Sequence, residues 1–357
     1  MSSVMLYEIN EKIIRLEREG REIIKFNLGD PDQQTPVEII EAAFEAMKKG
    51  KTKYASAAGE ARLREALAEI HGVNADNIVI TPGSKWAVFA AMYLLLNKGD
   101  NVVIPSPHWT AYDLVAKSLG VNVKLIKTRF ESNWEVDVED LKGLINGRTR
   151  LIILNNPNNP TSKVMNEKVV EKIVNVANER GIKVLSDEVY ADISFVKTKS
   201  LIEYEGEHIV VRSFSKTFAM TGWRIGYAIT DKALADKIIK LNQITFTNVP
   251  VFIQEAALKA LELRHQIVKA MRECYQKRAD LANKILSDTK LKFTKPEAPF
   301  YVFPKSNGLN SEMFALRLLD KGVAVVPGTS FGDYIEHFRI SLTAPDNEIE
   351  LGLKVIA

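Results

Sequence analysis

The residues most able to do chemistry lie in the stretch "VVRSFSKTFAMTGWRIGYAIT", residues 210–230. Lys216 follows an apolar run that is typical of a buried strand, and Arg224 stands eight residues further along. Lysine is seldom fully buried and burial lowers its pKa, so a lysine here can be a partly desolvated amine. Ser213 and Arg224 can bind phosphate, arginine with two parallel hydrogen bonds. The alternative is an ordinary surface lysine in a loop.

Three further candidate groups follow other apolar runs. Ser84 opens a helical pattern after the turn "TPG", where free N–H groups and the helix dipole favour an anion. Trp109 follows the run 101–105, and Asp187 ends the run 182–187. A buried aspartate must be paired or hydrogen-bonded. Each of these residues also has a structural interpretation: a plain connection, a packed ring or an N-cap.

Short apolar runs that alternate with helical patterns must position these residues. The runs are 77–81, 101–105, 121–126, 150–155, 182–187, 209–214 and 224–230, and helical patterns cover 84–98, 109–119 and 166–180. This alternation predicts an α/β fold, with a large domain built on a mainly parallel seven-stranded sheet that helices flank on both sides. The last two runs have no helix between them and could be antiparallel. Ligands of such sheets bind beyond the carboxyl ends of strands, so the candidate residues should share one rim.

The pattern changes after Pro250. Residues 250–286 have helical character throughout, which predicts one helix of about 50 Å that joins two domains. Strand-like runs at 300–304, 323–327 and 337–342, with a helix at about 310–321, predict a smaller α+β domain. We expect a large domain at 31–274 and a small domain formed by 1–30 and 275–357.

Composition restricts the class of protein. The 357 residues include 48 basic and 45 acidic side chains, a net charge of +3 that gives no reason to expect nucleic acid or an anionic membrane as partner. The single cysteine, Cys274, can form neither an internal disulfide nor a thiolate metal site, so we predict no metal centre. No signal peptide is visible, and the longest apolar run, 87–96, is too short to span a bilayer. We therefore expect a cytoplasmic protein.

Taken together, the candidate residues place a phosphate site, a stacking ring, a carboxylate and a lysine on one rim of one sheet. A phosphorylated, cationic, aromatic cofactor that needs a lysine fits this set. Pyridoxal 5′-phosphate (PLP) is such a cofactor: it forms a Schiff base with a lysine, and an aspartate partners its pyridinium nitrogen.

The sequence resembles the class I/II aminotransferases, the fold type I PLP-dependent enzymes of the aspartate aminotransferase group. The resemblance extends over nearly the whole chain, and its motifs occur in order. They are "NLGDPDQQTP" (27–36), "KYASAAGEARLREALA" (53–68), "TPGSKWAV" (81–88), "PSPHWTAY" (105–112), "NNPNNPTS" (155–162), "SDEVYADI" (186–193), "SFSKTFAMTGWRIGY" (213–227) and "FRISL" (338–342).

The resemblance implies a role for each matching residue. Lys216 would carry PLP and move a proton at the substrate's Cα, and Asp187 would face the pyridine nitrogen. The residues implied at the ring are Asn159, Tyr190 and Trp109, and those implied at the phosphate are Ser84, the backbone N–H of Lys85, Ser213 and Arg224. Arg339 would bind the substrate's α-carboxylate, with help from Gly29 and Asn159. Tyr54 would reach the phosphate of the neighbouring subunit, which implies a homodimer with shared active sites.

Three departures from the family pattern border the substrate entrance. The family usually has glycine where this chain has Ser162, and "GAFY" where it has "APFY" (298–301). The stretch from "FG" (331–332) to Arg339 is also shorter than usual. These differences leave the choice of substrate open.

Lys85 bears most directly on the substrate. In the branch that contains many prokaryotic aspartate aminotransferases, a lysine here can contact a distal carboxylate, which favours aspartate or glutamate as donor and 2-oxoglutarate as acceptor. Alternatively, Lys85 faces only solvent or the phosphate. An aromatic or aliphatic pocket is equally open, from Trp86, Phe214, Phe218 and Phe331.

Other classes of function are less well supported. A PLP-dependent C–S lyase would share the fold and release pyruvate and ammonia without a keto-acid acceptor. A non-catalytic PLP-binding regulator would carry an appended helix-turn-helix region, for which we expect no room before residue 27. A nucleotide-binding enzyme is suggested only by "GKT" at 50–52, where the upstream glycine of a phosphate loop is replaced by Glu45, and no G-x-G-x-x-G is present.

Overall fold

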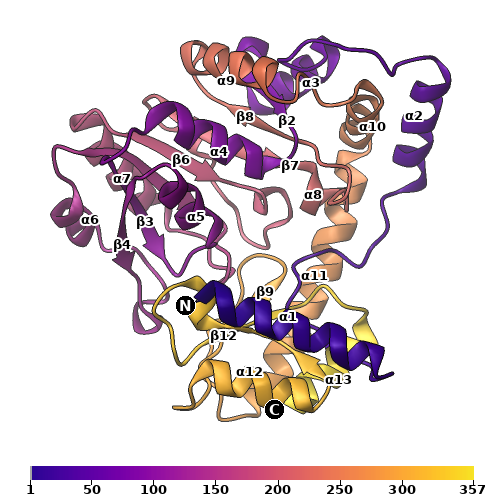
Figure 1. The fold of residues 1–357 in the computed structure, drawn as a ribbon, viewed down its shortest axis with the longest axis vertical. Coiled ribbons are helices and arrows are strands. Elements are labelled where there is room, and N and C mark those ends of the chain that lie inside the picture. The colour runs from indigo at the N-terminus through magenta and orange to yellow at the C-terminus, as the bar shows by residue number, and fades with distance from the viewer. Residues whose placement is uncertain (1) are drawn as a thin grey trace.

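The computed structural model describes residues 2–357, so Met1 of the predicted segment 1–30 lies outside the described residues. A large sheet with its helices forms one part of the molecule, and both ends of the chain meet in a second, smaller part (Figure 1). Separate hydrophobic clusters fill the two parts. The proposed boundaries at residues 31 and 275 stay a prediction.

The large sheet has seven strands in the order β2-β8-β7-β6-β5-β3-β4. Their bounds are β2 (Ile78–Thr81), β3 (Asn101–Ser106), β4 (Asn122–Lys127), β5 (Thr149–Asn155), β6 (Lys183–Asp187), β7 (His208–Ser213) and β8 (Gly226–Ile229). β8 is antiparallel to both of its neighbours, and the other pairings are parallel. The predicted mainly parallel sheet, with an antiparallel last pair, is confirmed.

Successive residues of a strand point to opposite sides of the sheet, and here the residues on both sides are apolar. Helices therefore cover both faces of the sheet. In β5, Ile152 and Leu154 belong to one buried cluster, and Leu151 and Ile153 belong to the other. The first cluster includes residues of α2 (Val37–Lys48), α3 (Ala61–His71), α6 (Val138–Leu144), α7 (Glu167–Glu179) and α10 (Val251–Glu262). The second includes residues of α4 (Ser84–Leu95), α5 (Ala111–Ser118) and α9 (Lys232–Ile244).

The carboxyl ends of the central strands lie side by side at one edge of the sheet. Asn155 at the end of β5 pairs with Asp187 at the end of β6, and Asp187 pairs with Val211 near the end of β7. A short helix, α8 (Phe214–Thr217), follows β7 directly. The polar residues that end or follow these strands therefore meet at one edge, as parallel topology requires.

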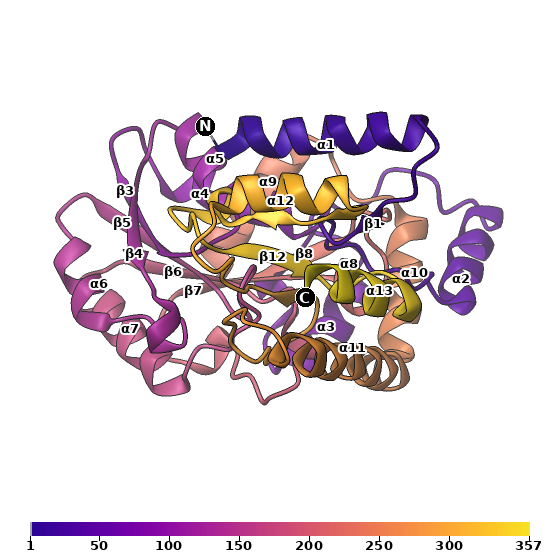
Figure 2. The same ribbon diagram turned by 90° about the horizontal axis from the view of Figure 1, so that it is seen from below.

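The smaller part is an α+β unit. β1 (Ile24–Lys25) pairs in parallel with β10 (Val323–Ala324), and β11 (Val326–Pro327), β12 (Phe338–Ser341) and β9 (Tyr301–Val302) form an antiparallel sheet in that order. The helices here are α1 (Ser2–Arg18), α12 (Ser311–Asp320) and α13 (Asp346–Ile356), and α1 runs alongside α12 (Figure 2). The N-terminal segment thus returns to the C-terminal part, as predicted.

The predicted single helix from Pro250 is wrong. The chain leaves helical geometry at Leu263, between α10 and α11 (Arg264–Ser287). No proline or glycine lies at the break, so the cause is tertiary packing. α10 packs on α2 and α3 of the large part, whereas α11 runs to α13 of the small part (Figure 1). At 1.5 Å per residue, α11 alone is about 36 Å long, enough to reach both parts.

Within residues 2–357, no helix is both long and apolar enough to cross a membrane.

Candidate active site

Residues from the strand ends of the large sheet and from the small part line one open pocket with a volume of about 330 Å³. The predicted residues that line it are Gly29, Ser84, Lys85, Trp109, Asn159, Asp187, Tyr190, Ser213, Lys216, Arg224 and Arg339. The sequence analysis missed six others: Tyr112, Asn155, Val189, Ser215, Thr221 and Tyr301. Tyr54 does not line this pocket within its own chain, and its side chain is 89% exposed.

Lys216 projects into the pocket from α8. The N-cap of this short helix is Ser213, whose hydroxyl accepts a hydrogen bond from the N–H of Ser215. The Lys216 ammonium is partly buried and donates to the carbonyl of Gly29, on a segment of the small part. Burial lowers the pKa of Lys216; Tyr301 and Asp30 oppose this effect, and the nearby charges of Arg339 and Arg224 add to it. The lysine is therefore the partly desolvated amine that its sequence position suggested.

Asp187 lies at the floor of the pocket and is almost fully buried. Its Oδ2 accepts a hydrogen bond of 2.8 Å from the hydroxyl of Tyr112, whereas its Oδ1 has no hydrogen-bond partner among residues 2–357. Burial raises the pKa of Asp187 to about 6, and the hydrogen bond from Tyr112 and the nearby backbone N–H of Val189 oppose this rise. A buried carboxylate oxygen without a partner fits a site that receives a cationic or N–H donor group.

One end of the pocket is built for an anion. Ser84 is the first residue of α4, after the N-cap Gly83, so the free N–H groups of that helix open into the pocket. Arg224, Ser213 and Ser215 surround the same end. Gly83 has φ of +82°, which favours glycine, and its Cα faces an Nη atom of Arg224 closely enough that a Cβ would lie 2.7 Å from it. Helix N–H groups, hydroxyls and a guanidinium together match a phosphate.

Arg339, on β12, forms another end of the pocket and is buried. One guanidinium nitrogen donates to Oδ1 of Asn159 at 3.0 Å, and the other donates to the carbonyl of Asn27 at 2.9 Å. Its central carbon lies 4.3 Å from the ring centroid of Tyr301 and 5.0 Å from that of Phe331. The guanidinium is therefore fixed by hydrogen bonds and by two rings, a pre-organised receptor for a carboxylate.

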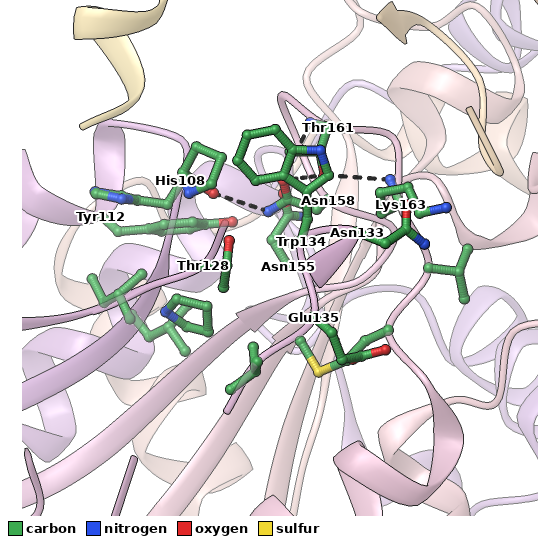
Figure 3. A pocket seen from close by; sticks show the side chains of 17 residues that line it. His108, Tyr112, Thr128, Asn133, Trp134, Glu135, Asn155, Asn158, Thr161 and Lys163 are labelled. Atoms are coloured by element: carbon green, nitrogen blue, oxygen red, sulfur yellow. Dashed lines mark hydrogen bonds between the residues drawn. The ribbon is translucent and has the colours of Figure 1, made fainter. Parts of the chain in front are cut away.

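Asparagines of the motif "NNPNNPTS" link the residues of the pocket by hydrogen bonds to the backbone. Asn155 Oδ1 accepts a hydrogen bond of 2.7 Å from the N–H of Asn159, and Asn155 Nδ2 donates to the carbonyl of Asp187. A small cavity of about 40 Å³ lies next to the site and shares Tyr112 and Asn155 with it (Figure 3). In the wall of this cavity Asn158 Nδ2 donates to the carbonyl of Pro107, which ties the loop to the end of β3.

The most informative missed residues belong to motifs that the sequence analysis quoted. Tyr112 ends "PSPHWTAY", Asn155 begins "NNPNNPTS" and Tyr301 ends "APFY". Tyr112 also packs edge-on against Trp109, with ring centroids 5.5 Å apart. Membership of a motif was the available signal, but only the fold shows that these residues reach the pocket.

Comparison with known proteins identifies the family. The profile of "Aminotransferase class I and II" matches residues 21–356. The chain belongs to this family. It is therefore a PLP-dependent aminotransferase, with an amino acid and a keto acid as its substrates.

Individual relatives resemble this aminotransferase over almost its full length. It is 39% identical to an aspartate aminotransferase of Thermococcus kodakarensis, over 98% of this chain and 91% of that protein. It is 36% identical to aromatic-amino-acid aminotransferase 2 of Thermococcus litoralis, over 92% of this chain and 89% of that protein. The solved structure of Thermus thermophilus aspartate aminotransferase with maleate superimposes with a TM-score of 0.95 at 33% identity, covering 100% of this chain and 96% of that one.

The pocket of this aminotransferase fits PLP. The cluster of Ser84, Ser213, Ser215 and Arg224 matches the phosphate, and the unpartnered Oδ1 of Asp187 matches a pyridinium N–H. The amine of Lys216 lies in the same pocket. Among the side chains described for this chain, no group of three or more His, Cys, Asp or Glu could hold a metal ion.

Proposed function

We propose that this enzyme transfers the amino group of L-aspartate or L-glutamate to a 2-oxo acid such as 2-oxoglutarate. The observation that carries the proposal is that the pocket contains Arg339 and Lys85 in addition to Lys216 and the arginine at the phosphate end. A dicarboxylic amino acid has one carboxylate for each of these two cations. Relatives named aspartate aminotransferase in Thermococcus and Pyrococcus support the same choice.

In this proposal the pocket holds PLP at three points. Lys216 forms the covalent link, and Asp187 faces the pyridine nitrogen and keeps it protonated. The residues at the ring are Trp109, which stacks on its face, and Asn159 and Tyr190, which bind its phenolic oxygen. The groups at the phosphate are Ser84, the backbone N–H of Lys85, Ser213 and Arg224. When bound, PLP supplies an electron sink for the negative charge left on the substrate's Cα.

The chain's own residues then orient the substrate and move the proton. Arg339 binds the α-carboxylate with Asn159 and the backbone of Gly29, and its fixed fork determines which bond at Cα faces the reacting centre. Lys216 would take the proton from the substrate's Cα and deliver it to the cofactor carbon that carries the transferred amino nitrogen. Because burial lowers its pKa, a larger fraction of this amine is unprotonated near neutral pH than for an exposed lysine.

Absorbance tests cofactor use. We expect the purified protein to be yellow, and borohydride to remove the absorbance band and fix the cofactor on Lys216, where peptide mass spectrometry would locate it. A colourless protein that takes up no added PLP would overturn the assignment.

Kinetics of Lys85→Ala test the substrate. The Lys85 ammonium lies 5.1 Å from the ring centroid of Trp109, at the edge of the pocket. If it binds the distal carboxylate, the variant should lose about tenfold or more in kcat/KM for aspartate relative to alanine, the loss of one charge-assisted hydrogen bond. Lys98→Ala, an exposed lysine beyond the same helix, is the control. An unchanged preference for aspartate over alanine would remove the basis of the proposal.

The same experiments address the alternatives. The relative named aromatic-amino-acid aminotransferase keeps an aromatic or aliphatic donor open, so the screen of donors should include phenylalanine, tyrosine and leucine, with 2-oxoglutarate and pyruvate as acceptors. A C–S lyase would release pyruvate and ammonia from cysteine-like donors without any acceptor. Amino transfer requires the acceptor.

We also propose that the enzyme is a homodimer in which Tyr54 of the partner subunit completes each site. Tyr54 is 89% exposed in the single chain, and α2 just before it exposes an apolar stripe. This stripe consists of Val37, Ile40, Phe44 and Met47, whose spacing places them on one side of the helix. Contiguous apolar surface of this kind is typical of protein interfaces, and a second copy of the chain is the occupant we propose.

Subunit mixing tests the shared site. Lys216→Ala alone should be inactive, and Tyr54→Phe alone should bind PLP more weakly. The two variants are then mixed so that dimers form with one subunit of each kind. In such a dimer one site has Lys216 from one subunit and an intact Tyr54 from the partner subunit, so tight PLP binding should return in half of the sites of the mixed dimers. If mixing restores nothing although mixed dimers form, Tyr54 acts within its own chain or not at all.

A further inference from the structure

Two of the sequence departures described above meet in the folded chain. The hydroxyl of Ser162 donates to the carbonyl of Pro299 at 3.2 Å and accepts from the N–H of Tyr301 at 3.1 Å. Ser162 is only 1% exposed, so these two hydrogen bonds have no competition from solvent. The hydroxyl thus bridges the peptide groups on both sides of Phe300, although Ser162 lies more than a hundred residues away in the chain.

The bridged residue has an unusual backbone. Phe300 has φ of +83°, in the region that bulky side chains rarely adopt. Its ring is fully buried against Tyr275, with centroids 4.4 Å apart, and against Tyr190, with centroids 5.5 Å apart. A conformation of this kind persists only where the surroundings hold it, and the Ser162 hydroxyl is one of the groups that hold it.

The strained residue determines where Tyr301 points. The Tyr301 ring lies 4.3 Å from the guanidinium carbon of Arg339, and its hydroxyl is 3.1 Å from that of Tyr190. A Cβ on Gly29 would lie 2.0 Å from the Tyr301 hydroxyl, so this ring also fills the space beside the Gly29 backbone. Tyr301 therefore touches three of the residues that we assign to the active site.

Ser162 itself occupies a position that favours glycine. Its φ is +53°, in the left-handed region that glycine adopts freely and other residues adopt at a cost. The family resemblance described above leads us to expect glycine here together with "GAFY". This chain has serine together with "APFY", and the serine hydroxyl binds that same segment. The two departures are therefore one structural feature.

We propose that Ser162 is a positioning residue for the carboxylate site: its hydroxyl fixes the backbone around Phe300 and so holds Tyr301 against Arg339. This proposal rests on the proposed role of Arg339 as the carboxylate receptor. The ring supports one face of the guanidinium, so its position affects how well the fork is oriented for a bound carboxylate. Loss of the hydroxyl should weaken carboxylate binding while the cofactor end of the pocket is unchanged.

The test compares Ser162→Gly and Ser162→Ala with the wild-type holoenzyme. Alanine removes only the hydroxyl, whereas glycine also removes the Cβ but adopts the backbone angle of +53° freely, so agreement between the two variants separates the hydroxyl from the backbone cost. The probe is maleate, a four-carbon dicarboxylate, and its Kd is measured by calorimetry together with KM and kcat for the amino-acid donor. We expect Kd and KM to rise roughly fivefold in both variants, the equivalent of one net hydrogen bond, with kcat changed less than twofold.

Ser194→Ala is the matched control. Ser194 is also a buried serine, and its hydroxyl donates at 3.1 Å to the carbonyl of Glu297, three residues before Phe300 and outside the two peptide groups that flank it. It removes a similar hydrogen bond without touching Tyr301, so its Kd for maleate should stay within twofold of wild type. The absorbance of bound PLP and the circular dichroism spectrum confirm that each variant is folded and loaded. An equal rise of Kd in the control would reduce Ser162 to a general structural role.

A further variant separates failure of this proposal from failure of the proposed function. Arg339→Lys keeps the charge but loses the fork, so it should raise the Kd for maleate far more than the Ser162 variants do. If Arg339→Lys weakens binding strongly while both Ser162 variants bind maleate like wild type, the positioning role is refuted and Arg339 keeps its assignment. If Arg339→Lys leaves maleate binding unchanged, the carboxylate site itself is wrongly placed, and the Ser162 proposal falls with it.

Discussion

Asp187→Asn should stabilise the cofactor-free protein although it removes a group that the reaction needs. Asp187 is almost fully buried, and its Oδ1 has no hydrogen-bond partner among the described residues. Burial therefore raises its pKa from 3.8 to about 6, so that at neutral pH the folded protein contains an unfavourable buried charge. Asparagine has the same shape, carries no charge and can still accept the hydrogen bond from Tyr112.

The size of the gain follows from linkage between ionisation and folding. A carboxyl group whose folded pKa is raised costs no stability below about pH 4, where it is protonated in both states. The penalty grows as pH rises from about 4 to about 6 and is constant above that. Each tenfold change in the ionisation constant is worth about 1.4 kcal/mol, so a rise from 3.8 to about 6 corresponds to a penalty of about 3 kcal/mol at pH 8. At pH 5 the penalty is about half as large.

Urea denaturation of cofactor-free wild type and Asp187→Asn at pH 8 and pH 5 measures this difference. The variant should unfold at higher urea at pH 8, with a smaller gain at pH 5, and its PLP-loaded form should have almost no aminotransferase activity. Asp236→Asn, an exposed aspartate on α9, should show neither effect. A variant no more stable than wild type at pH 8, or a gain of equal size at both pH values, would refute an uncompensated buried charge at this site.

Two other perturbations test the frame around the site. Arg278→Met should lower the free energy of unfolding in urea by about 3 to 5 kcal/mol, because the buried guanidinium pairs with both oxygens of Asp32. Lys277→Met, next to it in an exposed ion pair, should lower it by less than about 1 kcal/mol. Equal losses of stability in the two variants would refute the role of burial. Tyr112→Phe removes a hydrogen bond that lowers the pKa of Asp187. Asp187 is then protonated at higher pH, so the pH below which PLP binding weakens should move upward in a binding titration. An unchanged pH dependence of PLP binding would contradict this role of Tyr112.

The sheet and its functional edge were predictable because they depend on local patterns. Strands that are buried on both faces leave continuous apolar runs, and parallel topology then places the residues that follow them on one rim. Ser84, Asp187 and Lys216 reach one pocket for this reason alone. The chemical types of these three side chains, a hydroxyl, a carboxylate and an amine, then limited the ligands that the pocket could bind.

Other features depend on contacts that the sequence does not display. The break at Leu263 has no proline or glycine to announce it and follows from the two packing partners of α10 and α11. Ser162 and Tyr301 are 139 residues apart, so neither the apolar pattern nor local propensity could reveal the hydrogen bond between them. Tyr112 looked like an ordinary helix residue until the fold placed its hydroxyl on Asp187.

The distribution of charge in the pocket suits a lysine that must change its basicity during the reaction. Burial is the largest cause that lowers the pKa of Lys216. Tyr301 and Asp30 oppose it, and Arg339 and Arg224 add smaller lowering effects. In the proposed function, a phosphate neutralises Arg224 and a substrate carboxylate neutralises Arg339, so each anion removes one of the charges that oppose protonation of the amine. Burial by itself cannot produce this dependence, since it increases when the pocket fills. Neutralisation of the two arginines would therefore oppose the further lowering of the Lys216 pKa that a filled pocket imposes, at the stage when a proton has to be taken from Cα.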